Sequence, residues 1–312
     1  MLDLNIPPIS AITMGMVFTL LVIASFSRLL LEKKNPNQDY AELRQRIQSW
    51  WVIVLLLFVV LILSNNAAIT FFGLVSFLAL KEFLSIVPTR QTDRRILFWA
   101  YISIPFQYYW IASGWYEVSI IFIPVYVFLF LPMRAVLIGD TQGFIRSLSI
   151  IHWAVMLTVF CISHIAILLT LPVKNEQAGA IGLVLYLIFM TQFNDVCQYL
   201  WGKSFGRHKI IPKVSPNKTW EGLLGAMITM TVISAVIAPW LTPLTWQQGL
   251  AAGALISGSG FIGDVVVSSV KRDLRIKDSG DLIPGHGGIL DRMDSLIYTA
   301  PLFFHFLYYL HF

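Results

Sequence analysis

The segment SSVKRDLRIKDSGDLIPGHGGILDRMD, residues 268–294, is strongly polar and lies between long apolar runs. It carries five cations and five carboxylates around the glycine-rich PGHGG: Lys271, Arg272, Arg275, Lys277 and Arg292, with Asp273, Asp278, Asp281, Asp291 and Asp294. An otherwise apolar chain has concentrated its charge here. We therefore expect the chemistry of the protein to lie in this segment, and the apolar runs to hold it in place.

The composition around this segment is that of an integral membrane protein. Hydrophobic residues make up 57% and charged residues 12% of the chain, against about 45–50% and about 25% in soluble domains. A helix needs about 20 apolar residues to cross the hydrocarbon core, and the short alternating segments of a β-barrel are absent from the sequence. We predict an all-α polytopic fold with about ten transmembrane helices, at 11–31, 50–64, 67–87, 96–113, 117–133, 148–171, 179–201, 219–240, 248–270 and 295–311.

The positive charges fall on one side of these spans. When the spans alternate across the membrane, all of the 22 Lys and Arg residues except Lys81 and Lys174 share one side. Cytoplasmic loops carry such an excess. We therefore predict that both termini are non-cytoplasmic and that the polar segment faces the cytoplasm from the inner membrane. The same asymmetry accounts for the net charge of +5 without nucleic acid as a partner.

The whole chain, residues 1–312, is predicted to form one membrane domain, with less specific helices in 1–172 and a catalytic half in 179–312. The first cytoplasmic loop has helix-forming composition and ends in Trp50 and Trp51, which favours an anchor at the membrane surface. Lys81 and Glu82 lie near the cytoplasmic end of a span, where a structural ion pair and a functional role are both open.

Two acids lie inside predicted spans that lead into polar loops. Charged groups cost about 2.5–3.5 kcal/mol at the centre of a span and mark functional sites, which makes Asp195 and Asp264 candidates. Asp264, Ser268 and Lys271 fall on one helical face, so this face should line a cavity. The preceding GSGFIG, residues 258–263, has the spacing of a dinucleotide fingerprint but lacks the strand that such a site needs. We interpret it as a site of close helix packing.

The loop GKSFGRHKIIPKVSPNKTWEG, residues 202–222, is basic and leads into a helix. Backbone N–H groups at a helix N-terminus bind anions, and Ser, Asn and Lys side chains beside them add donors. The usual excess of positive charge in cytoplasmic loops explains the Lys and Arg residues of this loop, but it does not explain the SPNKTWEG segment. We expect the loop to bind phosphate groups, with Lys203, Ser215, Asn217, Lys218 and Glu221 as substrate-binding residues.

Residues 264–294 supply the other half of a phosphate-transfer site. Asp264, Asp291 and Asp294 carry the oxygen ligands that Mg²⁺ prefers. Gly287 and Gly288 let the backbone approach a ligand, beside His286 of the same PGHGG. Carboxylates for a metal next to cations for phosphate indicate phosphoryl or nucleotidyl transfer. The cations suited to phosphate oxygens are Lys271, Arg272, Lys277 and Arg292.

These residues carry a resemblance to a known family. The pattern Ser268, Lys271-Arg272, Lys277-Asp278 and Pro284-x-His286-Gly287-Gly288-x-x-Asp291-Arg292-x-Asp294 resembles the signature of the phosphatidate cytidylyltransferases, also called CDP-diacylglycerol synthases. SPNKTWEG and the GKxxG loop are similar to a second region of that family, and the likeness is strongest over 194–294. At residues 194–199 the usual family pattern is an acid followed closely by a small residue and Tyr. Asn194 and Gln198 depart from this pattern, which indicates a side branch of the family.

The resemblance implies transfer of CMP from CTP to phosphatidate, giving CDP-diacylglycerol and pyrophosphate, with Mg²⁺ and with K⁺ as a further cation. It implies that Asp264, Asp291 and Asp294 bind the metal and that Asp195 supports the pocket. It is also compatible with a homodimer. The predicted catalytic residues are Asp264, Lys271, Arg272, Lys277, Asp278, His286, Asp291 and Arg292. The predicted substrate-binding residues are Asp195, Lys203, Ser215, Asn217, Lys218, Glu221, Ser268, Gly287 and Gly288.

Other functions stay open from the sequence. A CTP-dependent lipid kinase, or a cytidylyltransferase for another lipid phosphate, would use the same groups. An ion-coupled transporter would use Asp195 and Asp264 as coupling sites, although no paired repeat is visible. The phosphate oxygen of phosphatidate is already an anion at neutral pH, so the cytidylyltransferase reaction needs no dedicated general base.

Overall fold

The protein is built from helices. The computed structural model describes residues 6–35, 39–280, 282 and 287–312. Within these ranges no strand forms, and Lys209 and Thr219 make an isolated antiparallel bridge. The predicted all-α fold is confirmed.

The chain folds into long helices, several of which contain a turn of another helical type. η2 and η3 are π-helical turns that join their neighbours into the continuous segments 116–136 and 144–170. In order, the elements are α1 (Pro8–Lys34), α2 (Ala41–Leu63), α3 (Asn65–Ile86), η1 (Gln91–Asp93), α4 (Arg94–Ala112), α5 (Tyr116–Ile121), η2 (Phe122–Val127), α6 (Phe128–Val136), α7 (Phe144–Val155), η3 (Met156–Cys161), α8 (Ile162–Ile167), η4 (Leu168–Thr170), α9 (Gly179–Phe205), α10 (Trp220–Leu241), α11 (Trp246–Asp273) and α12 (Leu290–His311).

Most of these helices are suited to a membrane. Within the described residues, eight helical segments are long and apolar enough to cross one, and each coincides with a predicted span. The helices α4 and α12 coincide with the predicted spans 96–113 and 295–311 but lie outside this set of eight. A polytopic membrane fold is therefore confirmed, and crossing by α4 and α12 stays a prediction.

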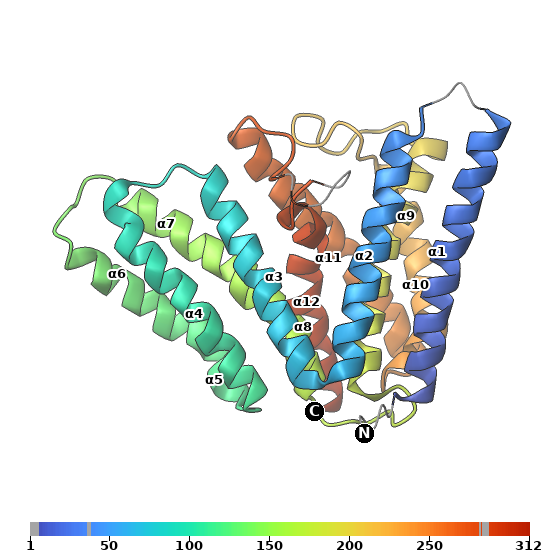
Figure 1. Ribbon diagram of the computed structural model, residues 1–312, viewed down its shortest axis with the longest axis horizontal. Coiled ribbons are helices and arrows are strands. Elements are labelled where there is room, and N and C mark those ends of the chain that lie inside the picture. The colour runs from blue at the N-terminus through green and yellow to red at the C-terminus, as the bar shows by residue number, and fades with distance from the viewer. Residues whose placement is uncertain (1–5, 36–38, 281, 283–286) are drawn as a thin grey trace.

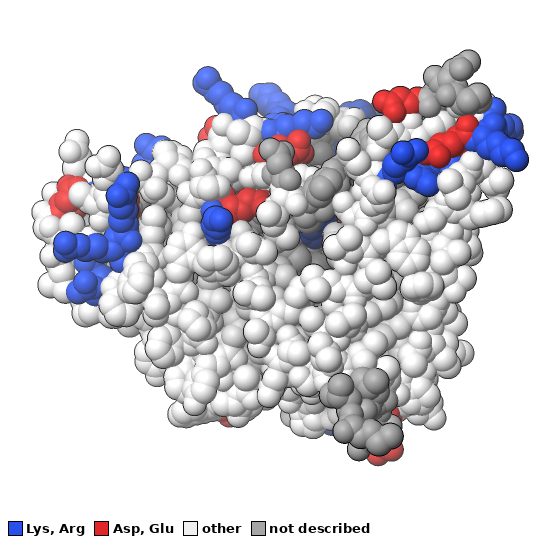
Figure 2. Space-filling model, in the orientation of Figure 1, with Lys and Arg blue, Asp and Glu red and all other residues white. Residues whose placement is uncertain are grey.

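Consecutive segments run in opposite directions, so α1 begins and α12 ends at the same end of the molecule (Figure 1). The α9–α10 connection and the described residues between α11 and α12 lie at the opposite end (Figure 1), which we call the polar end. Figure 2 shows Lys and Arg side chains gathered at the polar end of the visible face. On this face the positive charge lies mainly at one end (Figure 2), as the alternation of spans predicts.

The helix that contains the second predicted span, 50–64, begins well before the apolar run. Helix α2 begins at Ala41, because the helix-forming residues of the first loop continue the same helix. Trp51 of this segment donates from Nε1 to Ser25 Oγ of α1 at 3.0 Å. Residues 41–51 of the loop predicted to anchor at the membrane surface are therefore part of α2, which contacts α1.

Glycines allow α11 to pack closely against its neighbours. A Cβ at Gly253 would stand 2.6 Å from the Met230 carbonyl oxygen of α10. A Cβ at Gly263 would collide with the carbonyl oxygen of Asp294 on α12. Gly263 is the last residue of GSGFIG, so the predicted role of this motif in close helix packing is confirmed there. The contact sets α11 against the first turns of α12, which carry predicted site residues.

Candidate active site

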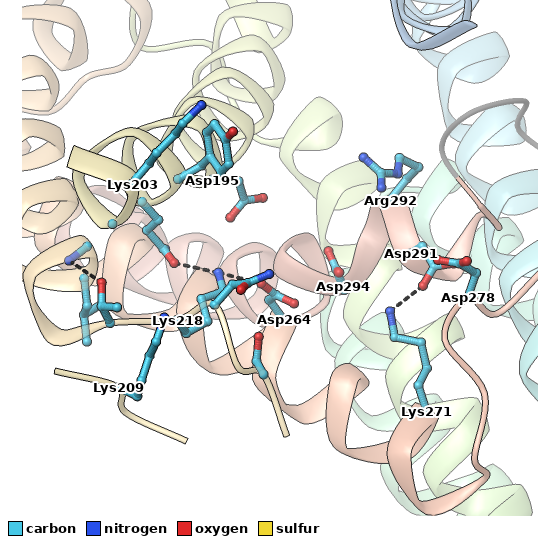
Figure 3. Close-up of a pocket in the computed structure, with 18 residues that line it drawn as sticks. Asp195, Lys203, Lys209, Lys218, Asp264, Lys271, Asp278, Asp291, Arg292 and Asp294 are labelled. Atoms are coloured by element: carbon cyan, nitrogen blue, oxygen red, sulfur yellow. Dashed lines mark hydrogen bonds and ion pairs between the residues drawn. The ribbon is translucent and has the colours of Figure 1, made fainter. Parts of the chain in front are cut away.

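A cavity of about 710 Å³ lies at the polar end (Figure 3). Its walls come from α9, α11, the start of α12, and the α9–α10 connection with the first turn of α10. Five Asp carboxylates and five Lys or Arg side chains line it. The two polar loops, which lie far apart in the sequence, therefore meet in one charged chamber.

Lys218 is held in this cavity by side chains from two helices. Its Nζ lies 2.6 Å from Oδ2 of Asp264 on α11 and donates to Oε1 of Gln198 on α9 at 2.8 Å. The other oxygen of Asp264 accepts from Ser268 Oγ, one turn further along α11, at 3.2 Å. Two partners on different helices fix the position of this ammonium group, so a cation is preorganised in the chamber.

The α9–α10 connection is tied to the start of α10. Thr219 is the N-cap residue, and its hydroxyl accepts from the Gly222 N–H at 3.2 Å. The Glu221 carboxylate accepts from the N–H groups of Arg207 and His208, at 3.0 and 3.2 Å. Glu221 therefore shapes the connection, and it does not line the cavity within the part of the chain that the structure describes.

Asp291 organises the loop before α12. One of its oxygens lies 2.6 Å from Lys271 Nζ, and the other accepts from the N–H groups of Ser279 and Gly288, at 2.8 and 3.1 Å. The Asp291 and Lys271 side chains are only 5% and 12% exposed. A buried carboxylate needs such partners, because an unpaired buried charge is costly. Its oxygens are thus already engaged by the protein.

Glu82, on α3, holds the same loop from the other side. Its carboxylate accepts from the N–H groups of Ile289 and Leu290, at 2.8 and 3.0 Å, and from the Ser279 hydroxyl. A carboxylate at these N–H groups stabilises the start of α12 through the helix dipole. A Cβ at Gly288 would collide with the Glu82 carboxylate. Glycine at 288 therefore makes room for Glu82.

Three further carboxylates point into the cavity from different helices: Asp195 on α9, Asp264 on α11 and Asp294 on α12 (Figure 3). The Ser295 hydroxyl donates to both oxygens of Asp195 at 3.2 Å, and the Ser295 N–H donates to Oδ1 of Asp294 at 2.7 Å. The like charges of these carboxylates repel one another. A bound cation would relieve that repulsion.

The donor chemistry of these three side chains fits Mg²⁺, which prefers carboxylate oxygens. Within the described residues, no group of three or more His, Cys, Asp or Glu side chains is gathered closely enough to hold a metal ion. Of the predicted ligands Asp264, Asp291 and Asp294, two already have partners at both oxygens. Lys218 and Ser268 bind Asp264, and Lys271 and the loop N–H groups bind Asp291. Metal binding stays a prediction.

Most predicted site residues line this one cavity. Ser268 contacts Asp264, and Arg272 donates from Nε to the Val214 carbonyl at 3.2 Å. Outside the lining, among residues the structure describes, are Ser268, Arg272, Lys277, Glu221, Gly287 and Gly288, whereas His286 lies outside the described residues. The predicted residues that line the cavity are Asp195, Lys203, Ser215, Asn217, Lys218, Asp264, Lys271, Asp278, Asp291, Arg292 and Asp294.

Sequence reasoning missed several contributors to this site. Gln198 and Tyr199 line the cavity three and four residues after Asp195, and this helical spacing alone could have identified them. Lys209, one of the cations of the basic loop 202–222, also lines it. The sequence marked Glu82 as a charge near the end of a span, but its partners could not be predicted, because they lie about two hundred positions further along the chain.

A second cavity, of about 750 Å³, lies between α2, α3, α9 and α12. Its lining is mostly apolar and includes Leu57, Phe71 and Met293. Arg292 lines both this cavity and the charged one. Its Nε is buried and has no hydrogen-bond partner among the described residues. A charged chamber and an apolar chamber therefore meet at one arginine.

Comparison with known sequences identifies the family. The sequence profile of the Cytidylyltransferase family matches residues 44–310, from the beginning of α2 to the end of α12. The chain belongs to the cytidylyltransferase family. This confirms the predicted resemblance, and it makes the protein a nucleotidyltransferase enzyme rather than a transporter.

Similar proteins fall into two groups. The chain is 47% identical to the uncharacterized protein YnbB of Escherichia coli K12, over 95% of this chain and 98% of that protein. It is 31% identical to the phosphatidate cytidylyltransferase of Bacillus subtilis, over 69% of this chain and 76% of that enzyme. It is 36% identical to the phosphatidate cytidylyltransferase of Haemophilus influenzae, over 43% and 49%. The near full-length match to YnbB agrees with the predicted side branch.

Proposed function

We propose that this cytidylyltransferase transfers CMP from CTP to phosphatidate, giving CDP-diacylglycerol and pyrophosphate. The observation that carries the proposal is the junction at Arg292, where the charged cavity meets the apolar one. A lipid phosphate has the same two parts, an anionic head group and acyl chains. The Bacillus and Haemophilus relatives are phosphatidate cytidylyltransferases, which supports phosphatidate as the acceptor.

The acyl chains would lie in the apolar cavity between α2, α3, α9 and α12. Apolar pockets of this size hold hydrophobic ligands, while a few polar groups fix their orientation. In this position the head group reaches Arg292, whose guanidinium group can bind two phosphate oxygens at once. The lipid would thus present its phosphate to the charged cavity, which CTP enters from the aqueous side.

In the reaction, an oxygen of the lipid phosphate attacks the α-phosphorus of CTP. The bond between that phosphorus and the oxygen bridging to the β-phosphorus breaks, and pyrophosphate leaves with the bonding electrons. The main barrier is the approach of two polyanions, so charge neutralisation and positioning supply the catalysis. The cavity provides Lys203, Lys209, Lys218 and Lys271 for this purpose. Lys218 is already fixed by Gln198 and Asp264.

Asp195, Asp264 and Asp294 are the residues that would hold Mg²⁺, with K⁺ as a further cation. Bound Mg²⁺ neutralises phosphate oxygens and polarises the reacting phosphorus. These three side chains belong to three different helices, α9, α11 and α12. Asp291 has another part in this proposal, because it fixes Lys271 and the loop before α12.

The cavity lies at the end of the molecule where Lys and Arg side chains gather (Figure 2). Positive loops mark the cytoplasmic side of inner-membrane proteins, and CTP is available there. We therefore place the active site at the cytoplasmic face of the inner membrane.

The proposal is tested with purified full-length protein in detergent micelles containing phosphatidate and Mg²⁺. CTP labelled at the α-phosphate should transfer its label to the lipid, and CTP labelled at the γ-phosphate should release its label as pyrophosphate. Transfer of the γ label would identify a lipid kinase instead. If the α label reaches the lipid only when another lipid phosphate replaces phosphatidate, CMP transfer is supported and phosphatidate is the wrong acceptor.

A further inference from the structure

Gln192 is a polar side chain in the lining of the apolar cavity. It lies on α9, one turn after Ile188, and the lining from α12 includes Met293 and Leu296. The Gln192 side chain is half-buried, both amide atoms are accessible, and neither forms a hydrogen bond with the described residues. A polar amide that faces an apolar cavity costs free energy unless it is hydrogen-bonded. A ligand in the cavity would supply the partner.

Two other polar residues of this lining differ from Gln192. The Thr70 hydroxyl is already satisfied, because it donates to the Asn66 carbonyl of its own helix at 2.8 Å. Asn66 lies in the first turn of α3, at the end of the molecule opposite the polar end. Gln192 lies well inside α9 and has no such partner. Its amide is therefore available at an intermediate depth of the cavity.

The depth of Gln192 relative to Arg292 follows from the packing of α9 against α12. The Ser295 hydroxyl of α12 donates to Asp195 of α9 at 3.2 Å, so these two residues lie at one level. The helices are antiparallel: Gln192 precedes Asp195 by three residues away from the polar end, and Arg292 precedes Ser295 by three residues toward it. At a rise of about 1.5 Å per residue, the two positions differ in depth by about 9 Å.

A lipid whose phosphate binds Arg292 carries its ester groups below the phosphate. In phosphatidate, the two ester carbonyls join the glycerol phosphate to the acyl chains, and below them the chains are hydrocarbon. A carbonyl oxygen can only accept a hydrogen bond, and the Gln amide nitrogen can only donate one. The amide of Gln192 thus has the right chemistry, on the cavity side away from the head group, to meet an ester carbonyl.

We propose that Gln192 determines acceptor specificity by donating a hydrogen bond from its amide nitrogen to an ester carbonyl of the lipid. This inference rests on the proposed function, which puts the acyl chains in the apolar cavity and the phosphate at Arg292. It adds the linkage that the enzyme recognises. Ester-linked lipids fit the site, and ether-linked lipids, which lack the carbonyl oxygen, leave the amide unpaired.

The experiment compares two lipids with the same chains, dihexadecanoyl phosphatidate and its dihexadecyl ether analogue. Each is offered at the same mole fraction in detergent micelles to full-length protein with CTP and Mg²⁺, and kcat/KM for CDP-lipid formation is measured. Loss of one hydrogen bond should make the ether a poorer acceptor by about fivefold or more in the wild type. The KM for CTP should be the same with both lipids.

The variants Gln192→Leu and Gln192→Met remove the amide and keep an apolar side chain of similar size. In both, kcat/KM for the ester lipid should fall to the value for the ether lipid, so that the ester-to-ether ratio approaches one. This ratio does not depend on how much of a preparation is folded, because both lipids meet the same protein. Gln247→Leu, the same substitution at an exposed residue in the first turn of α11, should keep the wild-type ratio.

Two results would overturn the inference. A wild-type ratio near one would show that the ester carbonyls are not recognised. A wild-type ratio of fivefold that persists in both Gln192 variants would show that another group recognises them.

Failure of the inference is distinguishable from failure of the proposed function. If the wild type transfers CMP to neither lipid, the proposed function fails, and the role of Gln192 falls with it. If the wild type transfers CMP to both lipids equally well, the proposed function stands and only the inference fails.

Discussion

The carboxylate of Glu82 on α3 accepts a hydrogen bond at 3.0 Å from the backbone N–H of Leu290, the first residue of α12. A second bond, from the Ile289 N–H, is 2.8 Å long. These bonds join the N-terminal helices to the turn from which Asp291 and Arg292 enter the cavity. The first half of the chain thus takes part in shaping the candidate active site.

Replacement of Glu82 should therefore lower turnover, although Glu82 does not line the cavity within the described residues. In Glu82→Ala, the partly buried N–H groups of Ile289 and Leu290 lose their acceptor. We therefore expect kcat to fall about tenfold or more, with a lower melting temperature. Glu82→Gln keeps one acceptor oxygen and should recover part of both. Steady-state kinetics and thermal unfolding in micelles measure these effects.

The control for this prediction is Glu117→Gln, in the first turn of α5 and away from the polar end. It should leave kcat and melting temperature unchanged. Wild-type turnover in Glu82→Ala would show that α12 keeps its position without Glu82.

The two outer glycines of GSGFIG should respond differently to alanine. A Cβ at Gly258 would make an ordinary 3.6 Å contact with Met227, whereas a Cβ at Gly263 would collide with the Asp294 backbone. Gly263→Ala must displace α11 from α12, and overpacking of this kind costs about 1–3 kcal/mol. We expect a lower melting temperature and reduced CMP transfer for Gly263→Ala, with Gly258→Ala close to wild type. Equal behaviour of the two variants is incompatible with this account of the motif.

Arg292 should govern use of the lipid substrate. It lines both cavities, and loss of a hydrogen bond to a charged group costs about 1.5–3 kcal/mol. Arg292→Ala should raise the KM for phosphatidate by about tenfold or more, and Arg292→Lys should recover only part of this, because lysine cannot bind two oxygens in a fork. Arg134→Ala, on α6, is the control. A change in the KM for CTP alone would assign Arg292 to the nucleotide.

The fold was largely predictable because membrane helices are specified by local composition. Each predicted span coincides with a helical segment, and the boundary that moved most, the start of α2, lies in a polar stretch with high helix propensity. Four charged residues that line the cavity could also be predicted as site residues, since charge is unusual beside apolar runs. They are Asp195, Lys218, Asp264 and Asp291.

What the sequence could not supply is the pairing between distant residues. Glu82 meets the loop before α12 only in the folded chain, and no spacing rule connects them. Glu221 was expected at the substrate because it lies beside SPNKT, but its carboxylate is bound by the N–H groups of Arg207 and His208. In both cases, hydrogen bonds that form only in the folded chain determine what the carboxylate contacts.

The most direct test of the central claim is pyrophosphate release by wild-type protein and by Asp264→Asn, with CTP, phosphatidate and Mg²⁺ in micelles. Asp264 binds Lys218 inside the cavity, and its replacement by a neutral side chain of the same shape removes charge from the reacting site. We predict release by the wild type only when both substrates are present, and a loss of about a hundredfold or more in Asp264→Asn with the melting temperature retained. No release by the wild type, or a wild-type rate in Asp264→Asn, would contradict the account.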